Sequence, residues 1–259
     1  MSELSASHER LITALARRKV RAQEGLFLAE GVRVVEELLA AGVGIRVAVV
    51  APTLEETERG RAIAATLHQR GDVARVGPAR MDRLSETRTS QGVLVVAEAP
   101  GATLDAIPVP PRTTVLVLDG VQDPGNLGTL ARSAAGFGCG ALLCLTGTVD
   151  PWNPKAVRAS AGALFRLPVV TAGVDESLAW LERGGFELLG ADAAGEPIDR
   201  VAFPERVALA VGNEGAGLGE SVRAGCDRIV AVPMREGTES LNVAVAAGIL
   251  LYVMTRGRA

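Results

Sequence analysis

The sequence is poor in the residues that most enzymes use for acid–base and metal chemistry. Among its 259 residues there are two histidines, His8 and His68, and three cysteines, at positions 139, 144 and 226. Both histidines lie far along the chain from the polar clusters described below, which argues against a histidine as general base. The cysteines have neither metal-ligand spacing nor an even count. We therefore expect reduced, buried thiols and no bound metal.

Aromatic residues and long apolar runs are also scarce. Aromatic side chains make up 3% of the chain and hydrophobic residues 48%, which predicts an aliphatic core. No apolar run reaches the roughly 20 residues that span a bilayer. The first residues, Met1 to Leu4, lack the basic and apolar regions of a signal peptide. We therefore expect a cytoplasmic protein without membrane contacts, with one large domain or two ordinary ones.

Positive charge is not abundant overall, but it is unevenly placed. The net charge of −3 argues against a protein coated in positive charge. Nevertheless, one short amphipathic segment contains Arg17, Arg18, Lys19 and Arg21. This segment is a candidate surface for contacts with phosphate groups. A solvated helix face is the alternative, and composition does not decide between the two.

Helix and strand patterns alternate along the first hundred residues, which indicates an α/β layer structure. We predict helices at 9–21, 30–41 and 57–69 and strands at 45–51, 73–76 and 93–97. A proline-rich, poorly periodic stretch follows, and we interpret 100–112 as a linker. The predicted domains are therefore 1–99 and 113–259.

The second predicted domain continues the alternation with strands that are apolar almost throughout. We predict strands at 115–118, 141–145, 167–170, 187–190, 207–211 and 229–232, and helices at 126–136, 154–163, 176–183, 219–225 and from about 241. Such strands are typical of a parallel sheet covered on both faces. Ligands of these sheets bind beyond the carboxyl ends of the strands.

The first of three polar clusters leaves the strand at 115–118. It turns through Pro124-Gly125 and enters a helix for which Asn126 is a candidate N-cap. Arg132 lies six residues further on, nearly two turns down that helix. Capping by Asn126 and plain solvent exposure of Arg132 are the structural alternatives to a functional role.

The second cluster, Gly212 to Leu218, contains three glycines directly after a strand. Such a turn lets the backbone approach a ligand closely. It lacks the GxGxxG spacing of a dinucleotide-binding fold and the lysine of a P-loop. Glu214 would repel a phosphate but suits a cation or a ribose hydroxyl. A plain strand-to-helix turn is the alternative.

The third cluster, Ser240-Leu241-Asn242, precedes the apolar run 243–254. Ser240 is the predicted N-cap, and Asn242 falls in the first turn of a helix that is apolar on nearly every face. That helix is therefore buried or packed on another chain. All three clusters lie where a strand ends or the next helix begins, which predicts a single active site.

The residues of these clusters resemble a known family. In order and spacing, Asn126…Arg132, Gly212-Asn213-Glu214-Gly215 and Ser240-Leu241-Asn242-Val243-Ala244 resemble the three motifs of the SpoU (TrmH-like) RNA ribose methyltransferases of the SPOUT superfamily. Phe27 to Gly31 and Thr89 to Gly92 look like parts of that family's L30e-like substrate-binding domain. The resemblance implies a C-terminal SPOUT α/β domain with a parallel sheet and a deep trefoil knot, and a smaller N-terminal L30e-like α/β domain.

The resemblance also implies an activity, namely methylation of a ribose 2′-hydroxyl in RNA with S-adenosyl-L-methionine as methyl donor. Ribosomal RNA is favoured over tRNA, because an L30e-like extension is typical of rRNA-reading members, and a homodimer through the knotted domain is expected. The implied cofactor-binding residues are Ala191, Gly212, Val232 and Leu241. The implied catalytic and RNA-positioning residues are Asn126, Arg132, Glu214, Ser240 and Asn242.

Three questions stay open at this point. In this family the arginine that matches Arg132 is proposed as general base, yet a guanidinium normally stays protonated in proteins. The alternative is that Arg132 binds the adjacent phosphate and orients the ribose. A non-catalytic RNA-binding assembly factor is a second function class. An ordinary Rossmann-type enzyme is disfavoured, because Gly136 to Gly140 follows a helix and lacks the fingerprint spacing.

Overall fold

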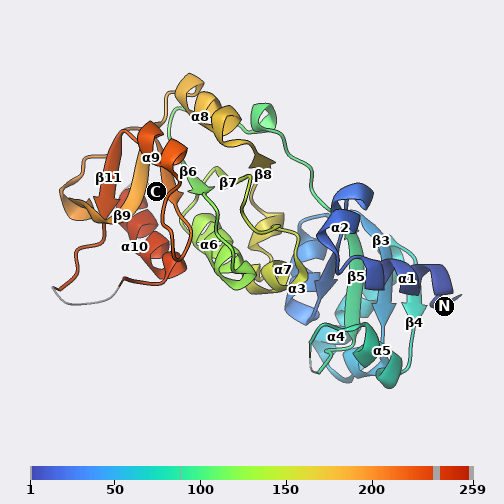
Figure 1. Cartoon of the computed structure of the whole chain (residues 1–259). Helices are drawn as coiled ribbons and strands as arrows, with labels where there is room; N and C mark the ends of the chain where they lie inside the picture. Colours follow the sequence, from blue (N-terminus) through green and yellow to red (C-terminus); the bar gives the residue numbers. More distant parts are fainter. Residues whose placement is uncertain (1, 88, 236–239, 257–259) are drawn as a thin grey trace. The chain divides into compact units, whose positions relative to one another are not determined.

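The protein forms two compact α/β units (Figure 1), as the alternating pattern predicts. The computed structural model describes residues 2–87, 89–235 and 240–256. One unit comprises Met1–Pro100 together with Trp152–Phe165, and the other comprises Gly101–Pro151 and Arg166–Ala259.

The first unit is built on a five-stranded mixed sheet with the order β1-β4-β3-β5-β2. Its strands are β1 (Ser2–Glu3), β2 (Leu26–Glu30), β3 (Ile45–Val50), β4 (Val73–Arg75) and β5 (Val93–Glu98). β5 runs antiparallel to both of its neighbours, whereas β1, β4 and β3 pair in parallel. The helices of this part are α1 (Ala6–Ala14), α2 (Arg18–Glu24), α3 (Val32–Ala40), α4 (Glu58–Arg70) and α5 (Pro78–Leu84).

The helix predicted at 9–21 is two helices in the structure, and Arg21 is the physical reason. Its side chain is 4% exposed. The Nη1 atom of Arg21 donates hydrogen bonds to the carbonyl oxygens of Leu15 (2.7 Å) and Ala16 (2.9 Å). These carbonyls lie just beyond the end of α1, so the guanidinium stabilises the turn between α1 and α2. Arg21 is therefore not available for RNA contacts, and that prediction is wrong.

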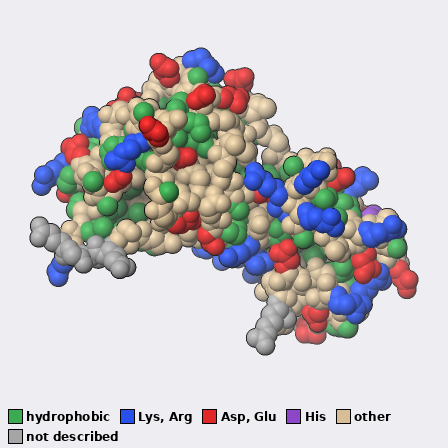
Figure 2. Space-filling view, in the orientation of Figure 1, with side chains coloured by type: hydrophobic (Ala, Val, Ile, Leu, Met, Phe, Trp, Pro, Cys, Tyr) green, Lys and Arg blue, Asp and Glu red, His purple; other side chains and the backbone are tan. Residues whose placement is uncertain are grey.

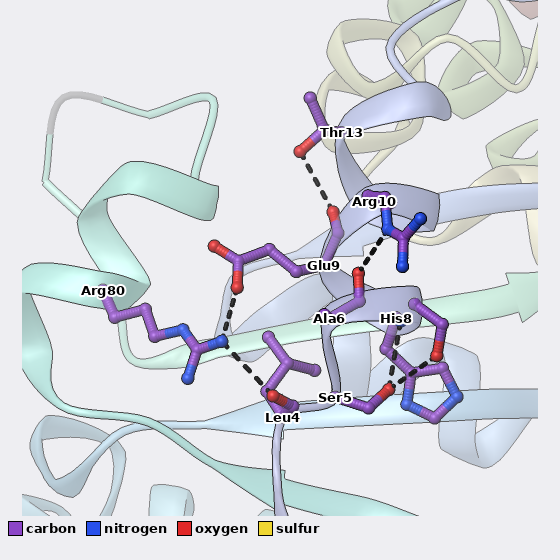
Figure 3. A network of polar contacts seen from close by, with 9 residues as sticks. Leu4, Ser5, Ala6, His8, Glu9, Arg10, Thr13 and Arg80 are labelled. Atoms are coloured by element: carbon purple, nitrogen blue, oxygen red, sulfur yellow. Dashed lines mark hydrogen bonds and ion pairs between the residues drawn. The ribbon is translucent and has the colours of Figure 1, made fainter.

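Polar contacts hold the N-terminal helix in place (Figure 3). Ser5 caps α1 by accepting a hydrogen bond from the backbone N–H of His8 (3.2 Å). Arg80 on α5 forms an ion pair with Glu9 and donates to the carbonyl oxygen of Leu4 (3.2 Å). His8 thus belongs to the first turn of α1.

The segment 152–165, predicted to belong to the second domain, groups with the first unit instead. Its helix α7 (Pro154–Ser160) packs on β2. The ring of Phe27 on β2 lies 5.0 Å from the ring of Trp152 and 5.7 Å from that of Phe165, centroid to centroid. These aromatic contacts bury apolar area, so they account for the grouping.

The second unit is built on a six-stranded sheet in which every strand pair is parallel, as predicted. The order is β11-β9-β10-β6-β7-β8. The strands are β6 (Thr113–Leu118), β7 (Ala141–Leu145), β8 (Val169–Ala172), β9 (Glu187–Pro197), β10 (Arg206–Val211) and β11 (Arg228–Ala231). The helices are α6 (Pro124–Gly136), α8 (Val174–Arg183), α9 (Glu220–Gly225) and α10 (Val243–Thr255).

The predicted linker is partly built into this unit. Leu104 and Ile107 lie in its hydrophobic core, where they are 4% and 5% exposed. The stretch is therefore anchored rather than free. Threading of the C-terminal segment into a knot stays a prediction from the resemblance.

Sheet register brings two of the polar clusters together. β10 pairs with β6 so that Val211 and Leu118, the last residues of the two strands, are partners. The backbone N–H of Asp119 donates to the carbonyl oxygen of Val211 (2.9 Å). The first and second clusters therefore leave the sheet side by side. α10 packs on α6, which brings the start of the third cluster's helix to the same place.

Candidate functional site

Side chains from the three clusters form one hydrogen-bonded chain. Asn126 donates from Nδ2 to Oε1 of Glu214 (2.9 Å), and Asn242 donates from Nδ2 to Oδ1 of Asn126 (3.0 Å). The three residues are separated by 88 and 116 positions in the sequence. The structure thus confirms that the clusters converge at the carboxyl edge of the parallel sheet. Ligands of such sheets bind at this edge.

Glu214 is held as a carboxylate anion at the start of α6. Its two oxygens also accept hydrogen bonds from the backbone N–H groups of Gln122 and Asp123, both at 3.2 Å. Burial acts to raise the pKa of Glu214, but the bonds from Asn126 and the backbone outweigh it and lower the pKa below 4.5. The positive end of the helix favours the anion as well.

The two predicted helix caps are wrong, and the errors are informative. α6 is capped by Asp123, whose Oδ1 accepts from the backbone N–H of Asn126 (2.9 Å). α10 is capped by Asn242, whose Oδ1 accepts from the N–H groups of Ala244 (2.9 Å) and Val245 (3.3 Å). The side chain of Asn126 is therefore free to bridge Glu214 and Asn242. Ser240 is exposed and does not cap α10.

The glycine-rich turn is closed by Asn213, which the sequence reasoning missed as a functional residue. Its backbone exchanges two hydrogen bonds of 2.9 Å with Gly217. Its Oδ1 accepts from the N–H groups of Gly215 and Ala216, and its Nδ2 donates to the carbonyl of Gly120, each at 2.9 Å. A Cβ on Gly212 would lie 2.1 Å from the carbonyl carbon of Gly217. Only glycine fits there. The available signal for Asn213 was an amide side chain two residues after the buried strand β10.

A cavity of about 520 Å³ opens beside this turn. Its lining includes the four predicted cofactor-binding residues and three of the predicted catalytic ones: Ala191, Gly212, Glu214, Val232, Ser240, Leu241 and Asn242. Among the described lining residues, the charged ones are Asp192 and Glu214, both acidic.

Asp192 was missed because the strand before it was predicted to end at Gly190, whereas β9 continues to Pro197. Its Oδ1 accepts from the backbone N–H of Ala194 (2.9 Å), and its Oδ2 pairs with Arg223. Both interactions lower the pKa of Asp192, the backbone bond most.

The remaining predicted site residues lie outside this cavity. Arg132 is exposed on α6 and has no hydrogen bond or ion pair with any residue in the described part of the chain. The structure of one chain therefore does not join it to Glu214. Arg17, Arg18 and Lys19 are exposed at the start of α2. Figure 2 shows Lys and Arg side chains over the region of α1 and α2.

Cys139 and Cys144 are buried, as predicted, whereas Cys226 is half-buried. Burial raises the pKa of Cys139 and of Cys144 to about 12, and that of Cys226 to about 11. Within the described residues, no group of His, Cys, Asp and Glu side chains is arranged to hold a metal ion.

These features define a class of protein. An all-parallel α/β sheet carries a ligand cavity and a polar side-chain network at its carboxyl edge, and a second α/β unit accompanies it. That is the architecture of an α/β protein with a ligand site at the carboxyl edge of its parallel sheet. In the described residues, no helix has the length and apolar character needed to cross a membrane.

Comparison with known families identifies the protein within this class. Residues 113–252 match the model described as the SpoU rRNA Methylase family, and residues 10–95 match the model described as an MRM3-like substrate binding domain. The chain belongs to the SpoU rRNA methylase family. The resemblance drawn from the three motifs is confirmed, and with it the SPOUT fold of the second unit.

Named relatives match over most of the chain. A 23S rRNA (guanosine(2553)-2′-O)-methyltransferase, RlmP of Bacillus subtilis, is 34% identical over 91% of this chain and 90% of its own length. A 23S rRNA (uridine(2479)-2′-O)-methyltransferase of Streptomyces viridochromogenes is 31% identical over 94% of this chain and 87% of its own.

A solved structure is similar over nearly the whole chain. The SpoU methyltransferase AviRb from Streptomyces viridochromogenes, crystallised with its cofactor AdoMet, has a TM-score of 0.90 and 31% identity over 98% of both chains. AdoMet, S-adenosyl-L-methionine, is the cofactor of this family, as the resemblance implied.

Proposed function

We propose that this protein transfers a methyl group from S-adenosyl-L-methionine to a ribose 2′-hydroxyl in ribosomal RNA. The observation that carries this proposal is the chain from Glu214 through Asn126 to Asn242, at the rim of a cavity lined by Gly212 and Leu241. RlmP and the Streptomyces relative, both named as 23S rRNA 2′-O-methyltransferases, support ribosomal RNA as the substrate.

The cavity fits the cofactor in size and in charge. A volume of about 520 Å³ lies within the range of small-molecule sites. Its described charged lining residues, Asp192 and Glu214, are carboxylates, which suit a ligand that carries a sulfonium and an ammonium group. When bound, the cofactor supplies an electrophilic methyl group. Apolar side chains such as Val211 and Val232 keep water away from it.

The polar chain positions the ribose. Glu214 is ionised and fixes the amide orientation of Asn126, and Asn126 in turn accepts from Asn242. Asn242 lines the cavity, and Asn126 lies next to it in the hydrogen-bonded chain, so both amides offer hydrogen-bonding groups to a ribose at the cavity mouth. Holding the 2′-hydroxyl in line with the S–CH₃ bond contributes several kcal/mol toward lowering the barrier. Ser240 lies on the same lining and is assigned to ribose or RNA contacts.

Arg132 either is the general base for the 2′-hydroxyl or binds the adjacent phosphate and orients the ribose. In the folded chain its guanidinium is exposed on α6. A cation in that position is free to bind an RNA phosphate. The phosphate-binding role is favoured here because a guanidinium loses its proton with great difficulty.

A homodimer through α10 is part of the same proposal. Val245, Ile249 and Tyr252 on this helix are 51%, 37% and 54% exposed, although they are large apolar residues. A hollow of about 410 Å³ beside them is lined also by Asn126, Thr129 and Asn242. A second copy on this face would cover the apolar side chains and would enclose the site. The measurement is the mass in solution, for wild type and for Tyr252→Glu, which we expect to shift toward monomer.

RNA contacts by Arg17, Arg18 and Lys19, and action in the cytoplasm, complete the proposed function. The three side chains are exposed together in the first unit. The first unit contains residues 10–95, which match the substrate-binding-domain model, and this match supports a role in RNA binding.

Two measurements test the function. Calorimetry with S-adenosyl-L-methionine should show binding to the wild-type protein. Mass spectrometry of nucleosides from purified 23S rRNA and tRNA, with and without the gene, should show one 2′-O-methyl nucleoside lost from 23S rRNA. A loss from tRNA would move the substrate to tRNA. Cofactor binding without any lost nucleoside, or no binding at all, would favour an RNA-binding assembly factor.

A further inference from the structure

Two loops of the second unit leave the parallel sheet side by side. One follows β6 and comprises residues 119–123, which we call the β6 loop. The other follows β7 and comprises residues 146–149, which we call the β7 loop. β6 and β7 are parallel neighbours, and Leu118 pairs in register with Cys144 near the ends of the two strands. The proposed function gives the β7 loop no role.

Thr148 of the β7 loop joins the two loops through its hydroxyl group. The residue is buried, with 3% of its surface exposed. Its Oγ1 atom donates a hydrogen bond to the carbonyl oxygen of Leu118 (2.8 Å) and accepts one from the backbone N–H of Gly120 (3.1 Å). A threonine hydroxyl can donate and accept at the same time, so one side chain makes both bonds. It thereby fixes the point at which the chain leaves β6.

Two further contacts hold the loops together. Nε2 of Gln122 donates to the carbonyl oxygens of Gly147 (2.6 Å) and Gly120 (3.0 Å). The backbone N–H of Val149 donates to the carbonyl oxygen of Val121 (2.9 Å). Three consecutive residues of the β6 loop are therefore each bonded to the β7 loop.

The β6 loop also carries the backbone donors that hold Glu214. The N–H groups of Gln122 and Asp123 each donate to the Glu214 carboxylate at 3.2 Å, and this carboxylate accepts from Asn126 (2.9 Å). Because both donors of the loop are backbone groups, only the path of the chain sets where they point. The β7 loop fixes that path from the side opposite to Glu214.

Neither loop belongs to the wall of the cofactor cavity. Among the described residues that line the cavity, none comes from 119–123 or 146–149. Glu214 and Asn242 do line it, and they are the two ends of the polar chain that passes through Asn126. The contacts between the loops therefore reach the site by way of Glu214.

We propose that Thr148 and Gln122 are positioning residues for the methyl transfer. They hold the β6 loop so that its two N–H groups fix Glu214, and Glu214 fixes Asn126 for contact with the ribose. The inference rests on the proposed function, since it takes Glu214 and Asn126 as the groups that place the ribose. It predicts that loss of these contacts lowers the rate of transfer more than the binding of either substrate.

The test compares Thr148→Val with wild type in transfer of a labelled methyl group to a 23S rRNA transcript. Valine keeps the shape of threonine but lacks the hydroxyl. The value of kcat should fall about 10- to 100-fold, because a misplacement of about 1 Å that originates away from the chemistry has an effect of this size. The dissociation constants of S-adenosyl-L-methionine, by calorimetry, and of the transcript, by filter binding, should change less than about threefold.

Thr146→Val is the matched control. It makes the same substitution in the same loop, but Oγ1 of Thr146 donates to the carbonyl oxygen of Ala172 (3.3 Å) on β8 instead of to the β6 loop. Its kcat should stay within about twofold of wild type. An equal loss of kcat in Thr146→Val and Thr148→Val would overturn the proposal, because the effect would then belong to the β7 loop in general.

Two more variants separate positioning from stabilisation of the fold. Thr148→Ser restores the hydroxyl and should recover most of the lost rate. Gln122→Ala removes an exposed side chain, so its unfolding temperature should fall by less than about 3 °C. Its kcat should nevertheless fall about tenfold. This variant decides the question if Thr148→Val folds poorly, and a wild-type kcat for Gln122→Ala would overturn the proposal.

A double-mutant cycle shows whether Thr148 acts through Glu214. In a Glu214→Ala background the N–H groups of the β6 loop have no carboxylate to fix. Thr148→Val should then lower kcat by less than about threefold, although it has the full effect in wild type. Equal losses of kcat in the two backgrounds would contradict the route through Glu214.

Failure of this inference can be told apart from failure of the proposed function. If wild type binds the cofactor and methylates RNA while Thr148→Val and Gln122→Ala do so at the wild-type rate, the positioning role is refuted and the methyltransferase function stands. If wild type transfers no methyl group to RNA, the proposed function fails and the positioning role fails with it.

Discussion

The cavity of about 520 Å³ in the second unit and that of about 220 Å³ in the first differ in the charged residues that line them. In the second unit the described charged lining residues are the carboxylates Asp192 and Glu214. In the first unit they are Arg33, Arg158 and one carboxylate, Glu30, whose oxygens are already hydrogen-bonded. A cation-bearing cofactor and a polyanionic RNA need opposite surroundings.

The two units also differ in how their sheets are built. In the parallel sheet of the second unit, β6 and β10 end at the same edge. The polar clusters that follow them therefore meet. The mixed sheet of the first unit has no such common edge. Its cavity is instead completed by a segment from another part of the chain, Trp152–Phe165.

The largest expected effect comes from Arg132, which lies outside both cavities. Arg132→Ala should lower the rate of methyl transfer by about 100-fold or more, because it removes the group assigned to deprotonation or phosphate binding. Its affinity for S-adenosyl-L-methionine should not change. The measurement is transfer of a labelled methyl group to RNA, with calorimetry beside it. Near-full activity of Arg132→Lys would rule out a role specific to the guanidine group.

Within the second unit, the strongest effect on cofactor affinity is expected from a substitution in the glycine-rich turn. Gly212→Ala would place a Cβ 2.1 Å from the carbonyl carbon of Gly217, so the turn must move and cofactor affinity should fall more than about tenfold. Gly215→Ala is the control, since its Cβ would meet Oδ1 of Asn213 at 3.7 Å, an ordinary contact. Calorimetry should separate the two variants, and both should bind RNA normally. Equal affinities would contradict the assignment of this turn.

Asn242 caps α10, and we propose that it also takes part in the site; two variants distinguish these roles. Asn242→Ala removes the cap of α10 and should cost about 1 kcal/mol of stability, which lowers the unfolding temperature by about 2–4 °C. Asn242→Ser keeps a capping oxygen but loses the Nδ2 donor to Asn126. It should therefore keep the stability and lose methyl-transfer activity. If the serine variant is fully active, the hydrogen bond to Asn126 is dispensable.

The smallest effect concerns the pH dependence of stability at Glu214. The pKa of Glu214 is lowered in the folded protein, so its ionised form adds stability above its ordinary pKa of 4.5. This contribution is lost as the pH falls through the lowered value. The stability difference between wild type and Glu214→Gln, measured by urea unfolding, should be constant near pH 7 and should shrink below pH 4.5. A difference that persists unchanged at pH 3 would contradict the lowered pKa.

Much of the site could be predicted because its residues interrupt apolar segments. Gly212, Glu214 and Asn242 each stand where a buried strand or helix begins or ends, so local pattern alone located them. The caps were mispredicted for a reason that is not local. Each cluster holds two side chains able to cap its helix, and contacts between the clusters leave Asn126 to bridge Glu214 while Asp123 and Asn242 cap.

The sequence by itself determined the α/β class, the parallel sheet and the positions of the polar clusters, because hydrophobic periodicity and glycine placement are local properties. Only the tertiary structure decided that Arg21 is turned inward to carbonyl oxygens and that the segment of Trp152 packs on Phe27. It likewise decided that Arg158 on α7 lines a cavity together with Glu30 and Gln91. Each of these depends on which distant groups come within hydrogen-bonding or van der Waals distance.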